Sequence, residues 1–352
     1  MAVYASYVDA DTGSDSNGGT SWEDAWQTLQ HGLSNCNTGS IQGELLRLYL
    51  NGEFTLAGPL TFPTTFDGSL LALIGKTYGV DANGYRTSSA VIDLNLYSYA
   101  ASNANFIAHI GVHIKGIKGE GHGGGVINVG SSGFWRYCKF ENDPTSSGGY
   151  TFKSTQVGVR AADCDFLSSG THDFTVMPVN LYRCLLDGFR PGYCSRGGVF
   201  HRCRLRNSLI GTGSVINWNS VFIDHCSFYD SYVNVADNCI PHITNNVFHL
   251  SSGSADAINV NSRGAQVIEG NCYKGYSEDA QAIARTVDYT APTILVDDPF
   301  ADASNNLWTP SVELAEIVGF DGLTPGAVQA ASTGSAGFTG IRSYNRRRKV
   351  GT

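Results

Sequence analysis

One short stretch of the chain, Ile243-Thr-Asn-Asn246-Val-Phe248, decides the fold because its pattern recurs. The pattern is an apolar residue, two variable residues, a cysteine or asparagine, one variable residue and a second apolar residue. It recurs in six further segments: Trp135–Phe140, Ala161–Phe166, Leu181–Leu186, Phe200–Leu205, Ile223–Phe228 and Ile268–Tyr273. Successive cysteine or asparagine positions are 26, 20, 19, 23, 20 and 25 residues apart. A period of this length predicts a solenoid, whose coils pack only on their neighbours.

The cysteine or asparagine column predicts an internal ladder. A period of this size has room for three short strands and three turns, and at one turn a side chain can point inward and stack on its equivalent in the next coil. Stacked thiols would lie one strand spacing apart, about 4.8 Å, which is too far for disulfides. The nine cysteines also contain no CxxC pair, so no metal site is expected from them. The predicted ladder residues are Cys138, Cys164, Cys184, Cys203, Cys226, Asn246 and Asn271.

The repeat resembles the I-x-x-N-x-F turn motif of the pectin-lyase-like superfamily. Both ends of the chain are similar to that superfamily too. The segment from Tyr7 to Gln30 resembles the opening of many secreted and viral β-helix proteins, and the segment from Val296 to Gln329 resembles their closing segment. The resemblance implies an all-β fold, a right-handed parallel β-helix. Cysteine in place of most ladder asparagines departs from the family, and the fold hosts lyases, hydrolases, adhesins and phage spikes alike, so it does not define a chemistry.

The chain divides into four expected regions. These are an N-terminal strand with a capping helix (1–40), the β-helix (41–300), a closing segment (301–330) and an extended basic arm (331–352). The capping helix is expected to cover the open end of the first coil, which would otherwise be an exposed sheet edge. Ser21 is its predicted N-cap, and its apolar stripe is formed by Trp22, Trp26, Leu29 and Leu33.

Composition narrows the possible partners. The net charge of -8 disfavours nucleic-acid binding by the body of the chain. A basic run in the arm is the exception, and it either docks an acidic partner or is solvated: Arg346, Arg347, Arg348 and Lys349. No apolar run is long enough to span a membrane, and Met1 to Tyr7 lack the features of a signal peptide. No cofactor is expected, although the acids Asp9, Asp11 and Asp15 could bind calcium; turn formation is the preferred interpretation.

Candidate catalytic residues are sparse. A polysaccharide lyase needs a base and a cation, and a hydrolase needs paired carboxylates. The pair Asp173 and Arg190 could be a base and a clamp, or equally a surface ion pair. Further polar residues on expected outward positions or turns are candidates for glycan binding: His172, Tyr193, Asn234, Asp237, Asn259 and Asn261. A second polar group could bind a metal ion through its histidines, but a solvated strand face is the preferred interpretation: His109, His113, Lys115, Lys118, Glu120 and His122.

Two main function classes follow. The first is a bacteriophage virion protein of the capsid-associated, fibre or tail-spike type, located on the virion surface, contacting other virion proteins and binding host cell-surface polysaccharide. A homotrimer is expected for it by analogy with phage spikes. The alternative is a secreted polysaccharide lyase or glycoside hydrolase acting on an acidic polysaccharide, and a bacterial adhesin is a third option. The missing carboxylate array and the low charged fraction of 15% favour the first class.

Overall fold

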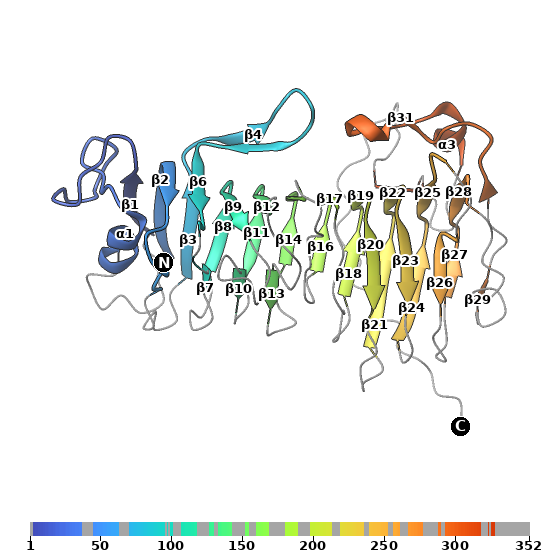
Figure 1. Ribbon diagram of the computed structural model, residues 1–352, viewed down its shortest axis with the longest axis horizontal. Helices are drawn as coiled ribbons and strands as arrows, with labels where there is room; N and C mark the ends of the chain where they lie inside the picture. Colours follow the sequence, from blue (N-terminus) through green and yellow to red (C-terminus); the bar gives the residue numbers. More distant parts are fainter. Residues whose placement is uncertain are drawn as a thin grey trace.

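The computed structural model confirms an all-β solenoid. It describes residues 3–36, 45–62, 70–95, 97, 99–100, 107–117, 127–129, 133–142, 152–154, 160–168, 180–188, 198–212, 219–235, 239–252, 256–260, 267–276, 288–289, 293–317, 323 and 325–327. Within these ranges, 22 strands are linked into one continuous parallel sheet that bends at a corner in every coil. Figure 1 shows the coils stacked along the long axis of the molecule.

The first face of the coil is a ladder of parallel strands, each paired with its equivalent in the next coil. Its strands are β1 (Val3–Asp9), β2 (Leu45–Thr55), β3 (Leu70–Gly75), β8 (Ile107–Ile110), β11 (Phe134–Arg136), β14 (Arg160–Ala162), β16 (Asn180–Tyr182), β18 (Gly198–His201), β21 (Asn219–Asp224), β24 (Cys239–Thr244), β27 (Val267–Glu269) and β29 (Asp288–Tyr289).

The second face follows the corner. The far half of β2 begins it, and its other strands are β6 (Ala90–Asp93), β9 (His113–Ile117), β12 (Lys139–Asn142), β15 (Asp165–Leu167), β17 (Leu185–Asp187), β19 (Arg204–Arg206), β22 (Ser227–Tyr229), β25 (Val247–His249), β28 (Cys272–Lys274) and β30 (Thr293–Ile294). Two shorter parallel sheets supply the third face: β7 (Tyr99–Ala100), β10 (Ile127–Val129) and β13 (Phe152–Ser154), then β20 (Leu209–Thr212), β23 (Tyr232–Val235) and β26 (Ile258–Val260).

The predicted ladder runs through the core at the corner between the first two faces. Every predicted member is at most 3% exposed, and the five cysteines of the ladder are free, so the expectation of unpaired stacked thiols is confirmed. Thiol and amide make the same hydrogen bond. The Cys226 thiol donates to the carbonyl of Phe200 at 3.5 Å, and the Asn246 amide donates to the carbonyl of Ile223 at 3.0 Å. Each acceptor lies three residues before the ladder residue of the preceding coil.

The two residue types also act as acceptors. The Oδ1 atom of Asn246 accepts the backbone N–H of Cys226 at 2.8 Å, and the sulfur of Cys184 accepts the N–H of Cys164. Burial raises the pKa of the Cys184 thiol well above its usual value, so the thiol keeps the proton that it donates. A cysteine therefore replaces an asparagine in this column because it supplies a weaker version of both hydrogen bonds.

The N-terminal end differs from the expected helix bounds. The helix exists and covers the first coil, but α1 spans Leu29–Asn35 and its N-cap is Thr28, not Ser21. The segment around Trp26 is extended, because its backbone N–H and C=O pair with β1 at Tyr7 and Asp9. Leu29 and Leu33 are buried as predicted, whereas the two tryptophans precede the helix.

The polar group expected around His109 is partly wrong. His109 is fully buried, stacked on Trp135 at 3.5 Å between ring centroids and bonded to the Tyr99 hydroxyl at 2.5 Å. The expectation treated residues 109–117 as one alternating strand pair. A corner at Gly111, where φ is 60°, separates β8 from β9 and reverses which side chains face inward. His113 and Lys115 lie on the outer side as expected, and Lys118, Glu120 and His122 lie outside the described residues.

Two segments cover the outer side of the second face. One is the antiparallel hairpin of β4 (Tyr78–Val80) and β5 (Arg86–Ser88). The other contains β31 (Phe300–Asp302), the 3₁₀ helix η1 (Ala303–Asn305), β32 (Leu307–Pro310) and α3 (Val312–Glu316). Figure 1 shows both along the same edge of the stack, and Asn306 of the second donates to the Asn83 carbonyl of the first at 2.9 Å. The outer side of the first face has no such cover among the described segments.

Candidate functional site

The corner of each coil carries two residues on the side away from the core just before the ladder residue, and neighbouring side chains bury Ala162, His225 and Asn245 among them. The second residue of each pair has a left-handed backbone, with φ between 52° and 57°, which is uncommon for residues other than glycine. Because this conformation recurs in coil after coil, the outward pairs form two columns along the corner. The pairs are Arg136/Tyr137, Ala162/Asp163, Tyr182/Arg183, His201/Arg202, Asp224/His225 and Thr244/Asn245.

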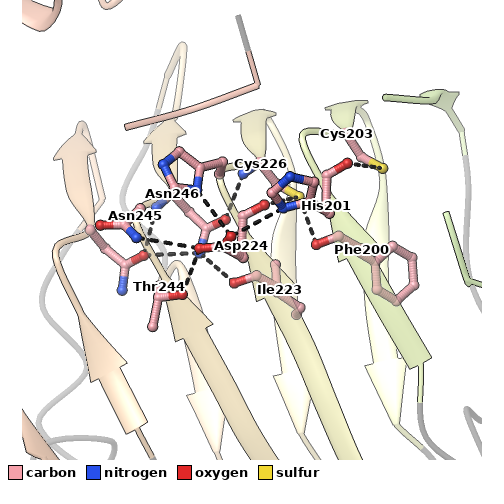
Figure 2. A network of polar contacts seen from close by, with 11 residues as sticks. Phe200, His201, Cys203, Ile223, Asp224, Cys226, Thr244, Asn245 and Asn246 are labelled. Carbon is pink, nitrogen blue, oxygen red and sulfur yellow. Dashed lines mark hydrogen bonds and ion pairs between the residues drawn. The ribbon is translucent and has the colours of Figure 1, made fainter. Parts of the chain in front are cut away.

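Asp224 is the centre of a polar network in these columns. Its Oδ2 atom lies 3.1 Å from His201 Nδ1 and 3.0 Å from His225 Nδ1. Its Oδ1 atom accepts from the Thr244 hydroxyl at 2.8 Å and from the Asn245 amide at 3.3 Å. Figure 2 shows side chains from three successive coils converging on this carboxylate.

The network keeps Asp224 ionised. Burial alone would raise the pKa of Asp224, but hydrogen bonds from His201 and His225, the charge of His225 and the Thr244 hydroxyl outweigh it, so the pKa lies far below its usual value. A carboxyl group held in this way is a permanent acceptor. It is a poor general acid at neutral pH, because a general acid needs a pKa near the working pH.

An aromatic pair continues the network along the first face. Phe222, two residues before Asp224 on β21, stacks on His242 of β24 with ring centroids 4.6 Å apart, and it is 40% exposed. Tyr182 packs edge-on against His201 at 6.4 Å. An exposed aromatic stack beside satisfied polar groups is typical of a recognition surface. We call this surface the outer strip; it consists of Tyr182, His201, Phe222, Asp224, His242 and Thr244.

Charged residues on the second face have a different environment. Asp165 is 1% exposed beneath the hairpin, where its carboxylate accepts the backbone N–H of Arg86 at 2.5 Å. Burial raises the pKa of Asp165 to about 6, although Arg204 and Arg86 lower it in part. Burial likewise lowers the pKa of Arg204. This acid has a pKa suited to proton transfer, but the hairpin closes it off from any substrate.

A second ion pair ties the covering segments to the coils. The Arg206 guanidinium contacts the Asp187 carboxylate, the Ser304 carbonyl and the Tyr85 hydroxyl, the last at 2.7 Å. One side chain thus joins a coil, the hairpin and the C-terminal segment. We interpret the ion pair of Arg206 and Asp187 as an attachment point, because Arg206 also contacts both covering segments.

The structure places few of the predicted site residues. Of the candidates for glycan binding, Asn234 and Asn259 are direct neighbours on β23 and β26, with Asn259 exposed. The remaining sequence candidates lie outside the described residues: His172, Asp173, Arg190, Tyr193, Asp237, Asn261, Arg346, Arg347, Arg348 and Lys349. They stay predictions.

The acids proposed as turn formers at the N-terminus are engaged with the backbone. Asp9 accepts the N–H groups of Asp11 and Thr12, and Asp15 accepts those of Gln27 and Thr28. The Asp9 contacts are local ones of the kind that the turn-forming interpretation predicted, whereas Asp15 joins residues 12 and 13 positions away. Calcium binding there stays an untested prediction.

Sequence reasoning missed the outer strip, although a signal was present. His201, Asp224 and Thr244 all stand two positions before a ladder residue, so the repeat alignment already put them in one column. Among the described residues, His201, Asp224 and His225 also form the one group of three potential metal-ligating side chains whose ligand atoms lie within 4.8 Å of one another.

Comparisons with known proteins give distant structural likenesses. No family model and no curated protein matches the chain. A rhamnogalacturonan lyase structure is similar at 15% identity with a TM-score of 0.40, covering 76% of this chain and 87% of that one. A GH136 lacto-N-biosidase from Eubacterium ramulus is similar at 11% identity with a TM-score of 0.38, covering 84% and 68%. A pectin methylesterase in complex with a hexasaccharide is similar at 11% identity with a TM-score of 0.29, covering 89% and 100%.

At these identities and TM-scores the likenesses do not indicate a chemistry, and the fold is established by the strand pairing. No helix of the described residues has both the length and the apolar character needed to cross a membrane. The strand pairing shows the parallel β-helix that the sequence resemblance to the pectin-lyase-like superfamily implied.

Proposed function

We propose that this β-helix binds a polysaccharide along the outer strip of its first face. The observation that carries the proposal is the exposed stack of Phe222 on His242 beside the ionised carboxylate of Asp224. A sugar ring offers C–H groups on its faces and hydroxyls at its edge. An aromatic ring can pack against the C–H groups, and fixed acceptors and donors can form hydrogen bonds with the hydroxyls.

The regular geometry supports a chain-like ligand. Equivalent side chains of successive coils lie about 4.8 Å apart along one straight face. Tyr182, His201, Asp224 and Thr244 occupy such equivalent positions on four consecutive strands of this face. A polymer of similar units can therefore meet a row of similar contacts, and each added unit raises affinity through effective concentration.

Binding assays with short neutral and acidic oligosaccharides test the proposal. We expect Phe222→Ala to weaken binding by roughly tenfold, the equivalent of about 1.4 kcal/mol. Phe134→Ala is the matched control, because Phe134 stands in the same outward column four coils away and is 37% exposed. Equal affinity of the two variants and the unmodified protein would contradict the proposal.

A polysaccharide lyase or hydrolase is the second candidate, favoured by the carboxyl of Asp165 with its pKa of about 6 near Arg204. It requires the hairpin, which covers Asp165 in this structure, to move away from the second face. A lyase would release unsaturated uronates that absorb in the ultraviolet, and a hydrolase would release new reducing ends. Product formation abolished by Asp165→Asn would establish this function in place of simple binding.

The proposed biological setting is the surface of a bacteriophage particle, with secretion as the alternative. The sequence features that favour it are the low charged fraction and the basic run Arg346 to Lys349. Mass spectrometry across a density gradient of the source culture tests it. Co-migration with assembled particles at fixed stoichiometry is expected, and recovery only as free protein would reject the virion assignment and the expected homotrimer of spike type.

A further inference from the structure

We propose that His201, Asp224 and His225 form a binding site for a divalent transition metal ion, with Zn²⁺ as the best-suited ion. This inference does not depend on polysaccharide binding. It also differs from the sequence-based expectation, which predicted no metal site from the cysteines and did not consider these three residues together. The site lies at the corner between the first and second faces, on β18 and at the end of β21 (Figure 2).

The three ligand atoms are already spaced for one ion. Asp224 Oδ2 lies 3.1 Å and 3.0 Å from the two histidine Nδ1 atoms. In a tetrahedral zinc site with bonds of about 2.0–2.1 Å, ligand atoms lie roughly 3.3–3.4 Å apart. The two pairs that Asp224 Oδ2 forms therefore need shifts of only a few tenths of an ångström, and all three ligand atoms lie within 4.8 Å of one another.

The surrounding residues hold the central ligand in place. Asp224 Oδ1 is fixed by Thr244 and Asn245, which leaves Oδ2 directed at the histidines. Such outer contacts orient ligands and support affinity in known metal sites. His225 is 1% exposed and its backbone is fixed in the left-handed corner conformation, so its ring loses little freedom on binding. His201 and Asp224 come from paired positions on neighbouring strands.

The ligand types select the class of metal. Two imidazoles and one carboxylate suit Zn²⁺, Co²⁺, Ni²⁺ or Cu²⁺, whereas Ca²⁺ and Mg²⁺ prefer shells of oxygen atoms alone. The adjacent thiol of Cys226 is excluded, because it is fully buried in the ladder and donates to the Phe200 carbonyl. The side chains of His201 and Asp224 are 35% and 33% exposed, so a fourth coordination position would face solvent.

Calorimetric titration of chelator-treated protein with Zn²⁺, together with Co²⁺ absorption spectra, tests the inference. We expect one ion per chain with a Kd in the micromolar range or below, and a Co²⁺ spectrum of nitrogen and oxygen ligands without thiolate charge-transfer bands. His201→Ala and Asp224→Asn should each weaken binding at least tenfold. His225→Asn should do the same while keeping the corner, since Asn245 takes a φ of 55° one coil later, close to the 52° of His225.

His242→Ala is the matched control, because this histidine lies on the same face in the next coil and belongs to no such cluster. Thermal unfolding of each variant separates lost ligands from lost structure. No saturable Zn²⁺ binding, or binding that survives His201→Ala and Asp224→Asn, would overturn the inference. Equal loss in His242→Ala would also overturn it, because it would assign the ion to a different set of ligands.

Discussion

The first and second faces of the β-helix are built from the same coils but differ in what covers their outer side. On the first face, the outer strip leaves an aromatic stack and a charged network open to solvent. On the second, outward residues such as Leu185, Val247 and Cys272 are at most 1% exposed beneath a C-terminal segment that adds Phe300 and Trp308 to a second core. The difference shows that in a uniform solenoid the role of a face depends on what lies over it, since strand pairing alone makes the faces equivalent.

The largest effect is expected from removing the main buried side chain of the C-terminal covering segment. Trp308 is 3% exposed, packs edge-on against Phe300 at 5.2 Å and donates to Asn306 at 2.7 Å. We expect Trp308→Ala to destabilise the attachment of this segment by about 3–5 kcal/mol, the usual cost of truncating a buried tryptophan. Hydrogen exchange of residues 293–317 measures it. Leu307→Ala, at a neighbouring residue 50% exposed, is the control and should have little effect.

The buried acid beneath the hairpin should make the covered face sensitive to pH. Because burial raises the pKa of Asp165 to about 6 from 3.8, folding favours its protonated form. The stabilisation by that proton is complete below pH 4, falls as pH rises towards 6 and is lost above pH 6. Asp165→Asn should therefore be about 3 kcal/mol more stable than the unmodified protein at pH 8, since one pKa unit corresponds to about 1.4 kcal/mol.

Urea unfolding at pH 4 and pH 8 checks this prediction. The advantage of Asp165→Asn should disappear at pH 4, where the unmodified carboxyl is already neutral. An equal advantage at both pH values would mean that the charge of Asp165 is not the cause.

A smaller effect is expected where the two covering segments meet. Tyr85→Phe removes the hydroxyl that Arg206 contacts at 2.7 Å and should cost about 1 kcal/mol, the typical net contribution of one hydrogen bond. Combining it with Asn306→Ala, which removes the bond to the Asn83 carbonyl, gives a double-mutant cycle. Strict additivity of the two losses would show that the hairpin and the C-terminal segment attach independently.

The smallest effect on stability should come from the open face. Phe222→Ala removes a ring that is 40% exposed, and we expect the free energy of unfolding to change by no more than about 0.5 kcal/mol. Urea unfolding measures the change. A loss comparable to that of Trp308→Ala would show that the outer strip is part of the packing and would remove the distinction between the two faces.

The sequence predicted the repeating parts of this molecule well. The ladder residues could be identified because their repeat is local and their chemistry is limited to small, buried, weakly hydrogen-bonding side chains. The hairpin was missed, although Asn83-Gly84 is a turn signal between two short strands, because its burial partner lies far away in the sequence. His109 was misplaced for a related reason, since a corner at Gly111 changes which alternate residues face inward.

The candidate site was the hardest part to predict. Asp224 and His201 meet only because their strands pair in register, and that register follows from coil lengths that vary between 19 and 26 residues. Asn234 and Asn259 were placed correctly on outward positions, since alternation within one strand is a local property.

The ladder has a consequence for how this protein can change in length over evolution. Each ladder residue bonds only within its own coil and to the two adjacent coils, and no cysteine whose side chain the structure describes forms a covalent link between coils. A duplicated or deleted coil would thus meet neighbours with the same donors and acceptors as before. The number of coils, and with it the length of the surface that the protein displays, is free to vary in whole units.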